Sequence, residues 1–139
     1  MAAVPFRRFA SKILADGFLA KGKTTGIGYR SGVGGAVTQT TNRSTGVTLD
    51  KLCGTITTDA TSLAAGGDAT FVVTNSKVAA SDVVVACVKS GGTTPGSTIA
   101  VVSAVAAGSF SITVTNLHAS TADTAALVIN FVVLKSVAA

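Results

Sequence analysis

Apolar residues divide most of the chain into short segments of the kind that form β-strands. In residues 109–116, Phe110, Ile112 and Val114 alternate with serine and threonine, as expected of a strand with one face in water. Residues 83–88 and 127–134 are instead almost continuously apolar. Such runs are typical of strands that are covered on both faces. We therefore expect a subunit interface over the outer face of these two strands.

The same pattern predicts eight short strands separated by glycine-rich turns. Their expected ranges are 36–40, 47–53, 54–58, 69–75, 82–89, 97–105, 109–116 and 126–135. Clusters of turn-forming residues lie at 65–68, 90–96 and 107–108. Short strands at this spacing predict an all-β fold, either a sandwich or a small barrel. We favour a jelly-roll-like β-sandwich domain that occupies residues 36–139.

Residues 1–35 follow a different pattern. Phe6, Phe9 and Ile13 recur at helical spacing, which predicts one short amphipathic helix at about residues 5–20. Glycine then recurs too often for a helix to continue, so the rest of this segment is expected to be extended. We expect residues 1–35 to form an N-terminal arm that orders only against a partner.

A faint internal repeat has an offset of 41 residues. Asn75 and Asp82 recur as Asn116 and Asp123, together with four matches of smaller residues. Each unit is expected to consist of a strand, a Thr-Asn turn, a loop with the aspartate and a second strand, with one unit on each sheet. Asparagine and aspartate are expected to hydrogen-bond their own turns, which explains these positions without a functional role.

The composition agrees with a β-fold and excludes several other classes. Ala, Thr, Val, Gly and Ser make up 90 of the 139 residues, and Glu is absent, which excludes a coiled coil or helical repeat. A chain with 47% hydrophobic and 12% charged residues is far from the disordered class. The length suits one domain. Because no apolar run reaches the roughly 18 residues of a membrane helix, we expect no membrane partner.

The charge is divided unevenly along the chain. Residues 1–46 carry a net charge of +6, whereas residues 47–139 carry a net charge of −1. A basic segment of this kind is expected to bind an anionic partner. We favour an acidic protein surface over nucleic acid, because the basic residues are not interleaved with aromatic ones. A solvated tail without a partner is the remaining alternative.

Candidate catalytic and metal-binding motifs are weak. Residues 17–24 fit the letters of a phosphate-binding P-loop, but the glycine-rich sequence that follows cannot begin the required helix. Cys53, Cys87 and His118 lack the paired spacing of a zinc site. The two cysteines are expected to be small buried residues, and His118 to lie in a loop. We therefore expect no enzyme activity, no metal and no cofactor.

Several strings in the body resemble small structural proteins of tailed bacteriophages. The strings are residues 44–54 with 56–57, 63–66, 71–75 with 82–85, and 127–135. The resemblance covers about residues 33–137 and includes no catalytic motif. It implies a β-sandwich virion protein that self-associates, often as a trimer, on a capsid or a fibre.

From these observations, the leading hypothesis is a capsid decoration (cement) protein. The major capsid protein is then the expected partner, the chain is a homo-oligomer with a trimer favoured, and it is located in the virion after assembly in the host cytoplasm. The alternative is a fibre or tail-tip module for attachment to a host surface. The residues expected to dock on the capsid are Phe6, Arg7, Arg8, Phe9, Lys12, Phe18, Lys21, Lys23 and Arg30.

Overall fold

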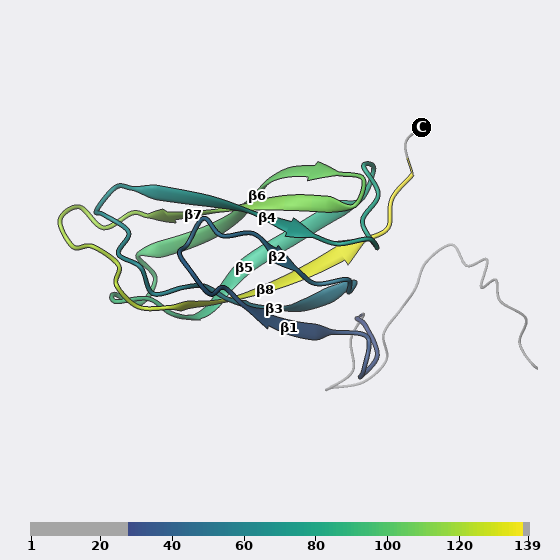
Figure 1. The fold of residues 1–139 in the computed structure, drawn as a ribbon, viewed down its shortest axis with the longest axis horizontal. Coiled ribbons are helices and arrows are strands. Elements are labelled where there is room, and N and C mark those ends of the chain that lie inside the picture. Colours follow the sequence, from purple (N-terminus) through teal and green to yellow (C-terminus); the bar gives the residue numbers. More distant parts are fainter. Residues whose placement is uncertain (1–27, 138–139) are drawn as a thin grey trace, which may run out of the picture.

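A computed structural model describes residues 28–137, in which the chain forms eight strands and no helix (Figure 1). The strands are β1 (Gly35–Thr38), β2 (Val47–Thr48), β3 (Cys53–Thr57), β4 (Asp68–Thr74), β5 (Val83–Gly91), β6 (Thr98–Ala106), β7 (Ser109–Asn116) and β8 (Leu127–Leu134). Each overlaps one of the predicted strands, so the all-β prediction is confirmed. The helix expected at about residues 5–20 lies outside the described residues.

The largest difference concerns β2, which has two residues where the sequence predicts a strand over 47–53. The chain leaves the sheet after Leu49, whose amide still donates to the carbonyl of Thr74. The amide of Lys51 then donates to the carbonyl of Leu49 and closes a tight bend. The bend carries the chain into the other sheet, where β3 begins at Cys53. The predicted strand therefore contains a change of sheet that its apolar pattern does not reveal.

The eight strands form two four-stranded sheets, visible as two layers in Figure 1. Sheet A has the order β1-β3-β8-β5, and sheet B has the order β2-β4-β7-β6. The β1–β3 and β2–β4 pairs are parallel, whereas the other neighbours are antiparallel. Among the described strands, only β6 and β7 are consecutive in one sheet. Every other connection crosses between the layers.

A single apolar core lies between the two sheets. Alternate residues of β8, including Ile129, Phe131 and Val133, meet alternate residues of β7 such as Phe110 and Ile112. The rings of Phe110 and Phe131 have centroids 5.2 Å apart and join the two layers directly. This alternation follows the apolar periodicity of the sequence, which therefore identifies the inner face of each strand.

One turn at the rim of sheet A requires glycine. Gly91 ends β5 with a φ of +93°, a conformation that other residues rarely adopt. A Cβ at this position would lie 2.1 Å from the carbonyl oxygen of Ala126. Glycine therefore allows the end of β5 to approach the start of β8 this closely.

The two repeat units do not occupy one sheet each, as the sequence analysis expects. The first unit consists of β4 and β5 and the second of β7 and β8, so each unit begins in sheet B and ends in sheet A. β4 and β7 are neighbours in sheet B, and β5 and β8 are neighbours in sheet A. The expectation is wrong because the loop after each Thr-Asn turn crosses the sandwich rather than returning along the same sheet.

Candidate interaction surface

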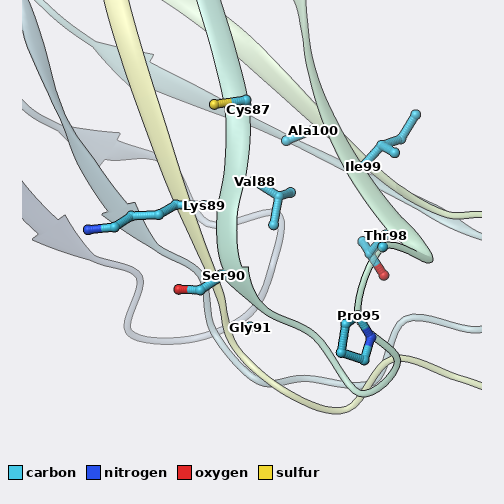
Figure 2. A pocket seen from close by; sticks show the side chains of 10 residues that line it. Cys87, Val88, Lys89, Ser90, Gly91, Pro95, Thr98, Ile99 and Ala100 are labelled. Atoms are coloured by element: carbon cyan, nitrogen blue, oxygen red, sulfur yellow. The ribbon is translucent and has the colours of Figure 1, made fainter. Parts of the chain in front are cut away.

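The outer face of sheet A carries apolar and small polar side chains over three adjacent strands. We call it the sheet A face and define it by the outward positions of β3, of β8 and of β5 as far as Cys87, because a bulge follows and the next side chain on this side of β5 is the charged Lys89 (Figure 2). These positions are Cys53, Thr55, Thr57, Val83, Val85, Cys87, Val128, Asn130, Val132 and Leu134. None of the ten side chains is charged. The sheet A face therefore consists of uncharged apolar and small polar side chains, and Lys89 lies at its border.

The register of sheet A brings its exposed apolar residues together. Val83 lies opposite Leu134, and Val85 lies opposite Val132. On the other side of β8, Cys53 also lies opposite Val132. Val83, Val85 and Leu134 are 51%, 49% and 51% exposed. These side chains form one contiguous patch, and such patches mark interaction sites more often than isolated surface valines do.

The outer face of sheet B, which we call the sheet B face, is organised differently. Its central strand β7 presents Ser109, Ser111, Thr113 and Thr115 outward. The Thr113 hydroxyl lies 2.8 Å from that of Thr70 and donates to Ser103 over 2.9 Å. Val72 on β4 is 48% exposed, but this hydroxyl row separates it from the exposed apolar residues of β6. The apolar residues of the sheet B face are therefore not contiguous.

The expectation that β5 and β8 are covered on both faces is only half met in the single chain. Their inner faces are buried, as Val84 and Ile129 illustrate. Among residues 28–137 no third layer lies over sheet A, so the outer positions of these strands are exposed or half-buried. The predicted subunit interface over these outer faces stays a prediction.

A groove of about 570 Å³ adjoins the sheet A face where β5 meets β6 (Figure 2). Val88 lies on the side of β5 that faces β6, whereas Cys87 and Lys89 point away from β6 (Figure 2). Ile99 and Ala100 line the opposite wall. Since Cys87 belongs to the sheet A face and also lines the groove, the two surfaces are continuous.

The expectation that both cysteines are buried is wrong for Cys87, which is exposed, whereas Cys53 is half-buried. Both lie on the sheet A face, on opposite sides of β8. Cys53 lies opposite Val132, and Cys87 lies opposite Asn130. Two strands that flank a third are about 10 Å apart. Because a disulfide needs Cα atoms within about 7 Å, Cys53 and Cys87 of one chain do not reach each other.

Arg43, counted with the basic segment from the sequence, is instead a buried residue of the body. Its Nε donates to the carbonyl of Thr61 over 2.6 Å, and its Nη2 donates to the carbonyl of Ala125 over 2.8 Å. Nη2 also lies 3.5 Å from Oδ1 of Asp123. Nη1 is buried and has no hydrogen-bond partner among the described residues. The charge of Arg43 is therefore held inside the fold and does not add to the basic surface.

Asp123 connects Arg43 to the loop between β5 and β6. Its Oδ2 accepts a hydrogen bond of 2.6 Å from the Thr98 hydroxyl, and its Oδ1 accepts one of 2.9 Å from the amide of Thr93. Burial raises the pKa of Asp123, but the hydrogen bonds from Thr98, Thr93 and Ala125 and the charge of Arg43 lower it more strongly. The net effect is a pKa below the ordinary value, so Asp123 is ionised at neutral pH.

Sequence reasoning identifies Asp123 only as a turn residue and does not find its contact with Arg43. The one available signal is the repeat, which singles out Asp123 but not its partner 80 positions earlier. The contact depends on how the loops from both sheets meet at one end of the sandwich.

Of the nine residues expected to dock on a capsid, eight lie outside the described residues, and Arg30 is exposed. The neighbouring Tyr29 donates its hydroxyl hydrogen bond to the carbonyl of Val133 on β8. This contact attaches Tyr29 to one end of sheet A. Arg30 therefore lies near the sheet A face.

The remaining candidates from the sequence do not come together. His118 lies in the loop after β7, where its Nδ1 accepts a hydrogen bond of 2.9 Å from the amide of Thr121. Across residues 28–137, no three His, Cys, Asp or Glu side chains gather as a metal site would require. The same part of the chain contains no helix long and apolar enough to cross a membrane.

Comparison with protein-family models, curated proteins and solved structures gives no match.

Proposed function

We propose that this chain is a structural virion protein that decorates and stabilises a bacteriophage capsid. Its jelly-roll-like β-body self-associates, with a trimer as the favoured state, and its basic N-terminal residues dock on subunits of the major capsid protein. The observation that carries the proposal is the contiguous, uncharged sheet A face on a chain whose first 42 residues contain six Lys or Arg and one Asp. The protein acts in the virion after assembly in the host cytoplasm.

The two kinds of surface support two kinds of contact. An apolar, uncharged sheet face suits association between proteins, because the centres of such interfaces are depleted of charge. A basic segment suits the acidic outer surface of another protein. A capsid presents this surface many times, so weak contacts of each arm add up once the bodies are linked in an oligomer. Arg30, exposed beside Tyr29, belongs to the proposed capsid contact.

A fibre or tail-tip module for host attachment is the second candidate, and one observation favours it. The loops at 90–97 and 117–124 contact each other at one end of the sandwich. The amide of Thr93 donates to the carboxylate of Asp123, and the amide of Leu117 donates to the carbonyl of Ser97. Joined loops at the tip of a sandwich are a common location for recognition.

The number of copies per particle separates these functions. We would purify virions of the phage that encodes the chain and measure its ratio to the major capsid protein by quantitative mass spectrometry. A ratio near one, or a simple fraction of one, is expected for a decoration protein. A handful of copies per particle would favour the fibre or tail-tip module. Absence from purified virions would refute both.

A further inference from the structure

We propose that the sheet A face, together with the free edge of β5, is the surface through which copies of this chain contact one another. The proposal rests on the proposed function only for the statement that the β-body self-associates. It names the surface, its central residues and its occupant, which is a second copy of the same chain.

The charge distribution favours a second copy as the occupant. The ten outward side chains of the sheet A face are uncharged, so copies of this face can meet around the axis of a trimer without repulsion between like charges. An acidic or basic partner would find no opposite charge among these ten positions; the charged residue of β5 is Lys89, which lies beyond Cys87 at the bulged end of the strand (Figure 2). Burial of the patch formed by Val83, Val85, Val132 and Leu134 against its own equivalents removes apolar surface from water on both sides.

The edges of the sandwich point to the same side of the molecule. At one side, sheets A and B end in β1 and β2, with four and two residues. At the other side they end in β5 and β6, with nine residues each. In β5, a bulge and Lys89 interrupt the edge after Val88, but residues 83–88 contain no charge and no proline. Unprotected edge segments of this kind invite pairing with other strands. A neighbouring copy that covers β5 removes this exposure.

The size of the surface explains why the contact extends beyond the sheet A face. Each outward position on a sheet covers about 30 Å², so ten positions cover roughly 300 Å² in projection. A stable interface buries about 800 Å² on each partner. The missing area is available next to Cys87, along the β5 edge and the groove between β5 and β6. We therefore infer that a neighbouring copy reaches over the β5 edge into this groove.

A matched pair of substitutions tests the proposal on the full-length chain. Val85 on the sheet A face and Val72 on the sheet B face are 49% and 48% exposed, and both lie within a strand. Val85→Lys is expected to weaken self-association at least about tenfold, because it places a charge at the centre of the contact. Val72→Lys is expected to leave it unchanged. Sedimentation velocity across a concentration series measures both, and circular dichroism checks that both variants are folded.

The reactivity of Cys87 provides a second measurement in the same proteins. In a Cys53→Ser background, Cys87 is the only thiol of the chain. Its labelling by a maleimide is expected to be slow in the oligomer and to become fast in the Val85→Lys variant. If Val85→Lys does not fold, Val83→Lys at the end of the same strand replaces it in both measurements.

Three results would overturn the proposal. The first is a wild-type chain that stays monomeric at all concentrations. The second is a Val72→Lys variant whose oligomer dissociates as strongly as that of Val85→Lys. The third is a Cys87 that is labelled at the same rate in oligomer and monomer. A monomer in which Val85→Lys lowers the unfolding midpoint would mean that another part of the chain covers the face. None of these results changes the copy number per virion, so failure here is distinguishable from failure of the decoration function.

Discussion

The two repeat units place the same residue types in different surroundings. Asn75 and Asn116 are fully buried, and each uses its Oδ1 to accept the amide of the residue two positions later. The two aspartates differ. Asp82 pairs with Lys135, whose side chain is 53% exposed, whereas Asp123 pairs with Arg43, which is 3% exposed. The repeat therefore preserves the local turn, while the surroundings determine what each carboxylate contributes to stability.

The largest expected difference in unfolding free energy is between the Asp123→Ala and Asp82→Ala variants, because Arg43 is buried. Asp123→Ala leaves this guanidinium buried without its carboxylate and removes the acceptor for Thr93 and Thr98. Loss of one partner of a buried ion pair costs about 3–5 kcal/mol of unfolding free energy. Asp82→Ala is expected to cost clearly less, because Lys135 is free to turn into water. Urea denaturation of both variants measures the difference, and equal losses would contradict the contrast between the two units.

Asn75 and Asn116 are expected to show a similar but smaller difference in their contributions to stability. Nδ2 of Asn116 lies within hydrogen-bond distance of the carbonyls of Leu63, Ala64 and Thr121, whereas Nδ2 of Asn75 donates to the carbonyl of Lys51 alone. Asn116→Ala is expected to cost about 1–3 kcal/mol, and Asn75→Ala less, because fewer carbonyls lose their partner.

A conservative variant separates the two roles of Asn116. Asn116→Asp keeps the oxygen that accepts the amide of His118 but removes the donors to the three carbonyls. Its unfolding free energy should therefore fall nearly as far as that of Asn116→Ala. A variant that is as stable as the wild type would show that the turn, and not the bridge between loops, is the main contribution.

The smallest expected effect concerns acid sensitivity. The pKa of Asp82 is lowered first by the amide of Ala79 and then by Lys135, and the pKa of Asp123 is also below the ordinary value of 3.8. Ionisation of both groups therefore stabilises the fold above pH 3.8, and this contribution is lost as the pH falls through the folded-state pKa values.

Replacing either group by its amide should make the stability less dependent on pH in this acid range. Asp82→Asn and Asp123→Asn are compared with the wild type by urea denaturation at a series of pH values from neutral to acid. Each variant is expected to lose less stability below pH 3.8 than the wild type loses. An unchanged acid dependence in one variant would show that its carboxylate contributes equally in the folded and unfolded chain.

The strands were predictable because each alternates between core and surface at a period of two. Phe110, Ile112 and Val114 are buried as this pattern predicts. The pattern does not indicate to which sheet a strand belongs. The bend after Leu49 and the path of the repeat units were therefore not predicted. Contacts between distant loops were equally out of reach, as Arg43 illustrates. The exposure of Cys87 reflects the two-layer arrangement of the described strands, which composition does not encode.

The path of the chain between the layers also determines when the protein can fold during synthesis. β8, the last of the eight described strands to be synthesised, lies between β3 and β5 at the centre of sheet A, and β7 lies between β4 and β6 in sheet B. Of the described strands, only β6 and β7 form a hairpin from neighbouring sequence. The early strands must therefore wait for β7 and β8 before the two sheets are complete. We expect slow folding, with exposed strands in the nascent chain as substrates for chaperones.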